Sequence, residues 1–197
     1  MISVVQDLLF PPICVVCKEK SHHSYLCQLC WEQSSLLNPA ERCPHCFTAI
    51  DAAYQLCGRC EHEPFLLFPR AALFDQEAPI CRLVGRDELI DSFASFAFVQ
   101  WERLGWPLPD LVIPIPFGPS EIARAFAAKI ERPCIQLLRR KAWPIGIEQW
   151  LVQRDWVEEE QIMLLLDIGC TGRHLKLAER AIVEAFPKKV FVLSLKV

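Results

Sequence analysis

The strongest constraint on this chain is a set of four Cys-x-x-Cys pairs within its first sixty residues. Spacers of nine, twelve and ten residues separate successive pairs. Each pair makes a tight turn that directs two thiolates at one point, and two pairs complete a tetrahedral zinc site. The sequence therefore predicts two structural zinc ions held by eight ligands: Cys14, Cys17, Cys27, Cys30, Cys43, Cys46, Cys57 and Cys60.

Two ligand arrangements fit this spacing. Sequential pairing joins the first pair to the second and the third to the fourth, whereas cross-braced pairing exchanges the second and third pairs. Spacing alone leaves both open, and the ribbon-like look of each half favours the sequential arrangement. Both predicted sites are closed by four thiolates, which disfavours zinc-dependent catalysis because catalytic zinc needs an open position.

The cysteine count also bears on the compartment. The chain has 11 cysteines, so a disulfide framework would leave one thiol over. The N-terminus has no basic segment of the kind that starts a secretory signal, and it reads as a short amphipathic helix through Val4, Val5, Leu8 and Leu9 that ends at Pro11. We therefore expect a reduced, cytoplasmic protein rather than a disulfide-bonded or redox one.

Charge argues against a nucleic-acid reader. The formal net charge is −3 over 197 residues, and residues 1–62 hold four Lys or Arg against six Asp or Glu. Two fully thiolate-bound zinc ions would add further negative charge. A docking or scaffolding role for this segment is favoured over phosphate binding. So short a segment buries little apolar surface, so metal binding must supply most of its folding free energy.

The composition changes after Cys60, and we predict a zinc-ribbon module over residues 1–62 and an α/β domain over residues 63–197. Buried-strand and helix patterns alternate in the second part, which predicts a parallel sheet covered by helices. No apolar run is long enough to insert into a membrane. Helices are expected over Asp87–Arg103, Ile122–Ile130 and Leu175–Phe186, and strands over Asp110–Phe117, Cys134–Leu138, Ile162–Ile168 and Val190–Leu195.

One strand end carries residues suited to chemistry. The expected strand Ile162–Ile168 runs through a loop of small residues into a helix, and ligands of parallel sheets bind at such carboxyl ends. Backbone amides at the helix start can hold a phosphate. Asp167 is placed to accept hydrogen bonds from a sugar hydroxyl. The loop residues that would hold a 5′-phosphate are Cys170, Thr171, Gly172, Arg173 and His174, although a plain strand-to-helix turn fits the spacing equally well.

The layout of the chain resembles the ComF family of bacterial competence proteins, in which an N-terminal zinc ribbon precedes a type I phosphoribosyltransferase-like domain. The resemblance covers nearly the full length. Its landmarks are the segments Phe10–Cys17, Val112–Pro116 and Asp167–Gly172. Between them, Ser120–Lys129 resembles the family's helix and Leu137–Arg140 the arginine-bearing strand that follows it. It implies a phosphoribosyltransferase-like fold and a ligand such as ribose 5-phosphate or phosphoribosyl pyrophosphate, the latter with Mg²⁺. Asp167 would be the catalytic acid.

The chain departs from the family pattern in that loop. The acid pair of the family falls on Leu166 and Asp167, its two threonines on Cys170 and Thr171, and its last threonine on His174. The family's Arg-Gly-Phe-Asn-Gln stretch is also missing after Phe117. Since phosphoribosyl transfer needs charge neutralisation at the pyrophosphate, the sequence favours ligand binding over efficient transfer.

The resemblance implies a cytoplasmic protein beside the DNA-uptake machinery, whose zinc module contacts a helicase-like competence ATPase. The alternative is a non-enzymatic adaptor with a vestigial transferase site, in which the zinc ribbon binds a protein or, weakly or through a partner, single-stranded DNA. The tryptophans Trp143, Trp150 and Trp156 lie in a stretch that could cover the site and stack on a base. A simpler interpretation is that these tryptophan rings pack in the hydrophobic core or against a partner protein.

Overall fold

A computed structural model of the chain describes residues 13–21, 25–51, 55–62, 68–116, 120–141, 149–152, 162–167, 172–184 and 186–196. The N-terminal helix expected through Val4–Leu9 lies outside these residues. Within them, no helix has both the length and the apolar character needed to cross a membrane.

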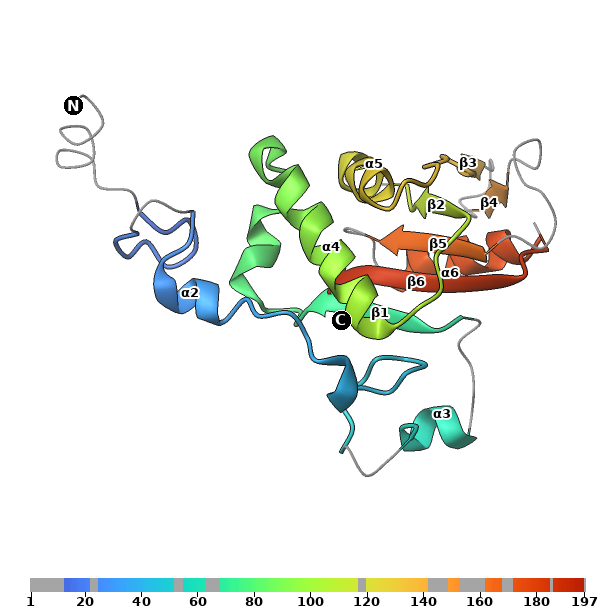
Figure 1. The fold of residues 1–197 in the computed structure, drawn as a ribbon, viewed down its shortest axis with the longest axis horizontal. Coiled ribbons are helices and arrows are strands. Elements are labelled where there is room, and N and C mark those ends of the chain that lie inside the picture. Colours follow the sequence, from blue (N-terminus) through green and yellow to red (C-terminus); the bar gives the residue numbers. More distant parts are fainter. Residues whose placement is uncertain are drawn as a thin grey trace.

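Among these residues, four parallel strands form the central sheet (Figure 1). Their order is β1(Arg70–Phe74), β6(Lys189–Lys196), β5(Ile162–Asp167) and β2(Leu111–Pro114). Every neighbouring pair is parallel, so all four carboxyl ends lie at one edge of the sheet. The expected α/β class, a parallel sheet with flanking helices behind a module of two four-cysteine sites, is confirmed.

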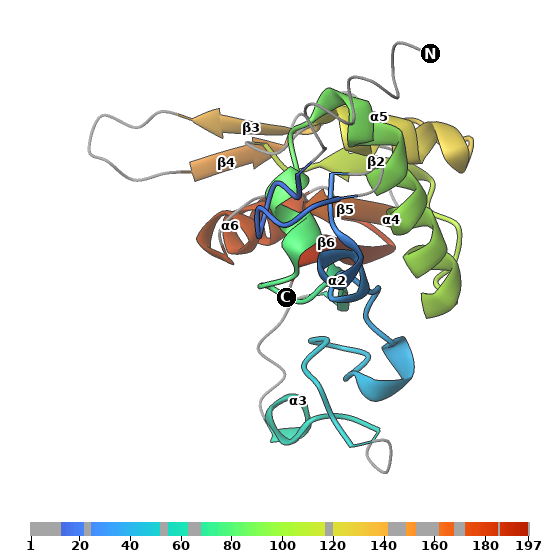
Figure 2. The same cartoon turned by 90° about the vertical axis from the view of Figure 1, so that its left-hand side faces the viewer.

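Helices cover both faces of this sheet. Figure 2 shows α6(Gly172–Val183) on one side and α4(Ile90–Leu104) with α5(Ser120–Lys129) on the other. Strand residues alternate between these layers, as the period of two requires. In β5, Leu164 and Leu166 join the cluster that contains α4 and α5, whereas Met163 and Leu165 join the cluster that contains α6. Burial on both faces explains why these strands read as continuous apolar runs.

The strand expected over Cys134–Leu138 is only partly present. Cys134 makes a single parallel bridge to Val112 and so touches the sheet beside β2. Leu138 instead begins β3(Leu138–Lys141), which pairs antiparallel with β4(Gln149–Val152). This hairpin packs against α6 rather than extending the main sheet. The parts of the tryptophan-containing stretch over 142–148 and 153–160 lie outside the described residues.

Short elements surround the cysteine pairs. These are α2(Gln28–Glu32), the 3₁₀ helix η1(Pro39–Glu41) and α3(Gly58–His62), followed after β1 by the 3₁₀ helices η2(Pro79–Leu83) and η3(Asp87–Leu89). The first cysteine module packs against the sheet's helices, because Cys14, Leu26 and Cys30 belong to the same buried cluster as Phe93 of α4. The division into two domains stays a prediction, and this shared cluster shows that the two parts are in direct contact.

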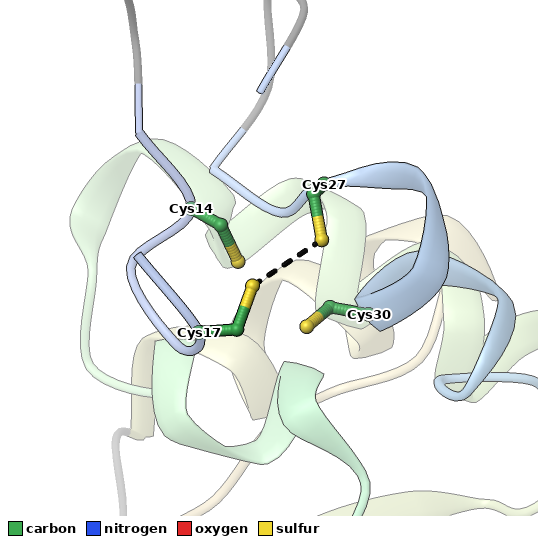
Figure 3. Close-up of side chains that lie close together, drawn as sticks. All are labelled: Cys14, Cys17, Cys27 and Cys30. Carbon is green, nitrogen blue, oxygen red and sulfur yellow. Dashed lines mark hydrogen bonds between the residues drawn. The ribbon is translucent and has the colours of Figure 1, made fainter. Parts of the chain in front are cut away.

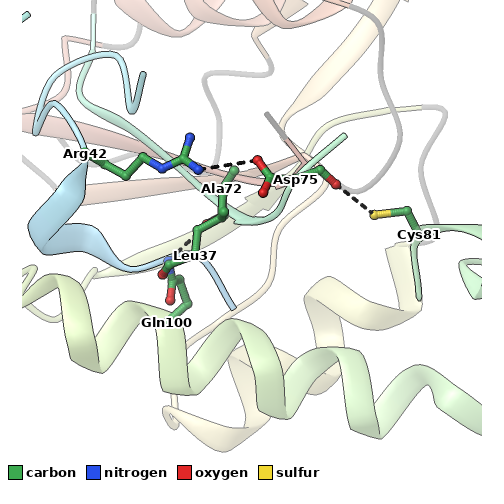
Figure 4. Close-up of polar contacts among 6 residues, drawn as sticks. All are labelled: Leu37, Arg42, Ala72, Asp75, Cys81 and Gln100. Carbon is green, nitrogen blue, oxygen red and sulfur yellow. Dashed lines mark hydrogen bonds and ion pairs between the residues drawn. The ribbon is translucent and has the colours of Figure 1, made fainter. Parts of the chain in front are cut away.

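The chain between the two cysteine modules is fixed along the outer edge of β1. The Leu37 backbone N–H donates to the Leu73 carbonyl at 2.9 Å. The Gln100 side chain of α4 is fully buried, and its amide nitrogen donates to the carbonyls of Leu37 and Ala72, each at 3.0 Å (Figure 4). One side chain thereby joins the inter-module segment, the edge strand and a core helix.

A buried ion pair joins β1 to α6. The Arg70 guanidinium donates to both carboxylate oxygens of Glu179, at 2.9 and 2.6 Å, and the Glu179 side chain is 3% exposed. Two parallel bonds of this kind fix the orientation of both groups. Because Arg70 starts β1 and Glu179 lies in the middle of α6, the pair sets the position of that helix on the sheet.

We predict that Glu179→Gln lowers the free energy of unfolding by about 3 kcal/mol, because it leaves the Arg70 charge without its partner in a mostly buried site. Glu121→Gln is the matched control. It removes one partner of the exposed Glu121–Arg124 pair and should cost less than about 1 kcal/mol. Urea unfolding followed by circular dichroism in zinc-containing buffer measures both, and equal losses would contradict the assigned role of the buried pair.

Candidate metal centres and the carboxyl edge of the sheet

The eight paired cysteines form two separate groups of four. Cys14, Cys17, Cys27 and Cys30 make one group, and Cys43, Cys46, Cys57 and Cys60 make the other, with all sulfur atoms of a group within 4.8 Å of one another. The grouping is therefore the sequential one. In Figure 3 the four thiols of the first group converge from a loop and from the start of α2.

Both groups are built by the same local structure. In the first, the Lys18 backbone N–H donates to the Cys14 carbonyl at 3.0 Å, and Lys18 has a φ of 67°. In the second, Phe47 donates to the Cys43 carbonyl at 2.8 Å with a φ of 62°. This left-handed residue after each leading pair closes the turn that aims two thiols inward. The trailing pair of each group flanks the start of a five-residue helix, α2 or α3.

The spacing of the sulfur atoms fits tetrahedral zinc. Four ligands at the usual zinc–sulfur distance lie about 3.8 Å apart along the edges of the tetrahedron. Cys17 Sγ and Cys27 Sγ are 3.5 Å apart, as are Cys46 Sγ and Cys57 Sγ. Both four-cysteine sites therefore fit structural zinc, and neither leaves a ligand position open.

The electrostatics of each group also call for a cation. Burial opposes ionisation of Cys14, but backbone N–H groups of Cys17, Cys27 and Val16 outweigh it and lower the pKa to about 6. The same balance, with N–H groups of Cys46, Cys57 and His45, lowers the pKa of Cys43 to about 6. In contrast, burial and the neighbouring Cys27, Cys14 and Cys17 thiols raise the pKa of Cys30 to about 12. One thiol of the first group therefore ionises readily while another resists until a metal neutralises the cluster.

His45 supports the second group without belonging to it. Its Nδ1 lies 3.9 Å from Cys60 Sγ, and its carbonyl accepts a 2.8 Å hydrogen bond from the Arg70 backbone N–H. Arg70 is also the partner of Glu179. The second cysteine group is thus connected through one residue to β1 and α6.

The strand–loop–helix layout expected at the phosphate loop is present. β5 ends at Asp167, which pairs with Ser194 of β6, and α6 begins at Gly172. Cys170 and Thr171 lie outside the described residues. Arg173 occupies the first turn of α6, and His174 follows it, half-buried.

Leu166 takes part in the core rather than in this edge. It is 1% exposed and belongs to the cluster under α4 and α5. Its apolar side chain is therefore matched to its surroundings, and an acid there would need a buried partner.

The structure adds a polar depression that the sequence did not predict. It has a volume of about 450 Å³ and lies where β1 and β6 end. Its polar lining consists of Gln76, Glu77, Cys81, Arg82 and Lys196. Because Lys196 follows Ser194, the partner of Asp167, by two residues, the backbones of Lys196 and Asp167 are on the order of 8 Å apart. The depression and the expected phosphate loop thus share the carboxyl edge.

The remaining described thiols are partly buried against the main cluster. Burial raises the pKa of Cys81, although the nearby Lys196 ammonium opposes this, and burial likewise raises the pKa of Cys134. Both groups are therefore neutral at physiological pH, as expected of packing cysteines rather than ligands.

The structure therefore defines a class of protein in which two four-cysteine groups precede and contact a parallel α/β fold. Residues 5–61 match the family described as "Double zinc ribbon domain". No curated protein matches the chain. Among solved structures, it is similar to a purine phosphoribosyltransferase from Pyrococcus horikoshii Ot3, with 14% identity, a TM-score of 0.43 and coverage of 54% of this chain and 72% of that one. An adenine phosphoribosyltransferase is similar at 14% identity and a TM-score of 0.43, over 59% of this chain and 74% of that one.

We predict that Cys30→Ser removes one of two zinc ions per chain, because the first site then has three thiolates and loses the ligand that the metal most stabilises. Cys134→Ser is the control and should keep two, since Cys134 lies in neither group. Elemental analysis of dialysed protein gives the ratio directly. A wild-type ratio of one, or an unchanged ratio in Cys30→Ser, would contradict the two-site assignment.

Proposed function

We propose that this chain binds a ribose 5-phosphate or phosphoribosyl pyrophosphate at the carboxyl edge of its sheet. The carrying observation is the common edge shared by the β5–α6 junction and the polar depression with Arg82 and Lys196. Phosphate would sit on the backbone amides before α6, and the two cationic side chains would meet further negative charge. The resemblance to ComF proteins in the Asp167–Gly172 loop supports the same ligand class.

Residues of the loop have separate proposed tasks. Thr171, Gly172 and their neighbours Cys170, Arg173 and His174 cradle the 5′-phosphate, and Asp167 holds a ribose hydroxyl. Mg²⁺ accompanies the pyrophosphate as its counterion. Leu166 supplies no carboxylate at this edge, so the proposal is ligand binding with transfer, if retained, slower than in enzymes with two acids.

The zinc ribbon has a structural task in this proposal. Two Zn²⁺ ions, one in each four-cysteine site, hold the segments that flank β1. The ComF resemblance supports a cytoplasmic role beside DNA uptake, with a helicase-like ATPase as the partner of the zinc module. Residues 1–62 form the proposed module, and residues 63–197 the ligand-binding domain.

A second candidate is an adaptor that binds protein or single-stranded DNA through the zinc module. The burial of Leu166 in the hydrophobic core favours it, because a core leucine at this position suits a fold that no longer needs the acid. A mobility shift of labelled single-stranded DNA, lost at high salt and indifferent to ribose phosphates, would select this candidate.

We predict that Lys196→Ala weakens binding of phosphoribosyl pyrophosphate at least tenfold, since a charge-assisted hydrogen bond contributes about 1.5–3 kcal/mol. Lys189→Ala is the matched control. It removes a lysine from the amino end of the same strand, so its affinity should stay within about twofold of wild type. Asp167→Ala and Thr171→Ala should also weaken binding. Isothermal titration calorimetry with Mg²⁺ measures all four, and no heat from wild type at millimolar ligand would contradict the proposal.

A further inference from the structure

An apolar pocket lies where the first cysteine module meets the helices of the sheet. Its volume is about 160 Å³, the size of one large side chain. The walls come from three parts of the chain. They include Leu26 and Trp31 from the cysteine module, Ile80 and Leu83 from η2, and Phe93 and Phe96 from α4. Among the described residues of the lining, only Tyr25 and Ser92 carry hydroxyls.

The pocket is open and its rim is apolar. Trp31 is 54% exposed even though its ring lies 6.2 Å from that of Phe96. Leu29 and Ile13, from the same module, are 63% and 54% exposed. Trp31 thus leaves apolar surface facing water at the pocket, and Leu29 and Ile13 add more on the same module, which is unfavourable unless something covers it.

The N-terminal segment of the same chain has the composition to cover it. Residues 1–12 lie outside the described part, and the chain enters that part at Ile13, in the module that forms one wall. The segment contains the apolar run Leu8–Phe10, and its only charged side chain is Asp7. Prolines at 11 and 12 stiffen the connection to Ile13.

The tether is short enough to bring this run to the pocket. The Val15 backbone N–H donates to the carbonyl of Tyr25, a lining residue, at 3.0 Å. Phe10 is five residues before Val15, so it can reach at most about 17 Å from it. A tether of this length gives an effective concentration on the order of millimolar, well above that of a free partner.

The positive charge beside the pocket is compatible with the N-terminal segment as its occupant. The Arg86 guanidinium lies 5.1 Å from the centre of the Tyr25 ring, beside the pocket. Asp7 precedes Leu8 and would meet this positive charge when the run is seated. We propose that Leu8–Phe10 of the same chain docks in this pocket, with one large side chain inserted, and so joins the first zinc module to η2 and α4. This proposal is independent of the ribose-phosphate site.

Photocrosslinking on the full-length chain tests the proposal. With p-benzoylphenylalanine in place of Phe10, irradiation should give crosslinks within one chain to peptides 25–31 and 80–96, identified by mass spectrometry. The same group in place of Phe186, which is 66% exposed and distant in sequence from the pocket, is the control and should not label these peptides. Crosslinks between two chains would assign the pocket to a second copy, and crosslinks elsewhere in the chain or none would assign it to another partner. Each of these results overturns the proposal.

Hydrogen exchange on variants gives a second, independent test. Leu8→Ser with Phe10→Ser should speed exchange at least tenfold in residues 89–96, because the inserted side chain no longer covers them. Ile13→Ser is the matched control, since it removes an exposed apolar residue of the same module without touching the docking run. Zinc content should stay at the wild-type value in both. Unchanged exchange in the double variant, with zinc retained, would overturn the docking.

Discussion

Four thiols held within 4.8 Å of one another are stable as thiolates only around a cation, and the N-terminal third of the chain depends on that constraint. The two α-helices described in this part, α2 and α3, have five residues each, too short to be stable alone. Burial and the neighbouring thiols raise the pKa of Cys30 while backbone N–H groups lower that of Cys14, so four adjacent thiolates need a neutralising cation. Both sites fit structural zinc, so metal binding is the expected source of order for these segments.

The consequence extends to the sheet because β1 is an edge strand. An unprotected edge presents unpaired N–H and carbonyl groups that invite pairing with other chains. Here the Leu37 and His45 backbones, one from the segment between the two cysteine groups and one from the second group, bond to Leu73 and Arg70 of β1. From α4, the buried Gln100 amide donates hydrogen bonds to the carbonyls of Leu37 and Ala72, and so joins the same two segments. The zinc module thus protects an edge that the α/β part leaves open.

The sequence was most informative where a local pattern of residue types is typical of one kind of structure. The cysteine pairs predicted both four-thiol groups, and the apolar run of β5 predicted a buried strand leading to α6. It was least informative where tertiary contacts decide. β1 was missed because it has only five residues, Arg70–Phe74, and directly follows Pro69. A strand close to β3 was expected from the resemblance over Leu137–Arg140, but β4 and the antiparallel pairing were missed because the partner lies across a long connection.

The same contrast between local and tertiary information applies to the candidate site, which combines the Asp167–His174 segment with Arg82 and Lys196. A strand-to-helix loop is local in sequence, so Asp167 and the residues up to His174 were accessible to pattern reasoning. Arg82 belongs to η2 and Lys196 to the end of β6, and only the sheet order β1–β6–β5 brings them to the same edge as the end of β5. Leu166 and Lys196 both make this edge less negative. The leucine supplies no carboxylate at the end of β5, and the lysine places a positive charge at the end of β6.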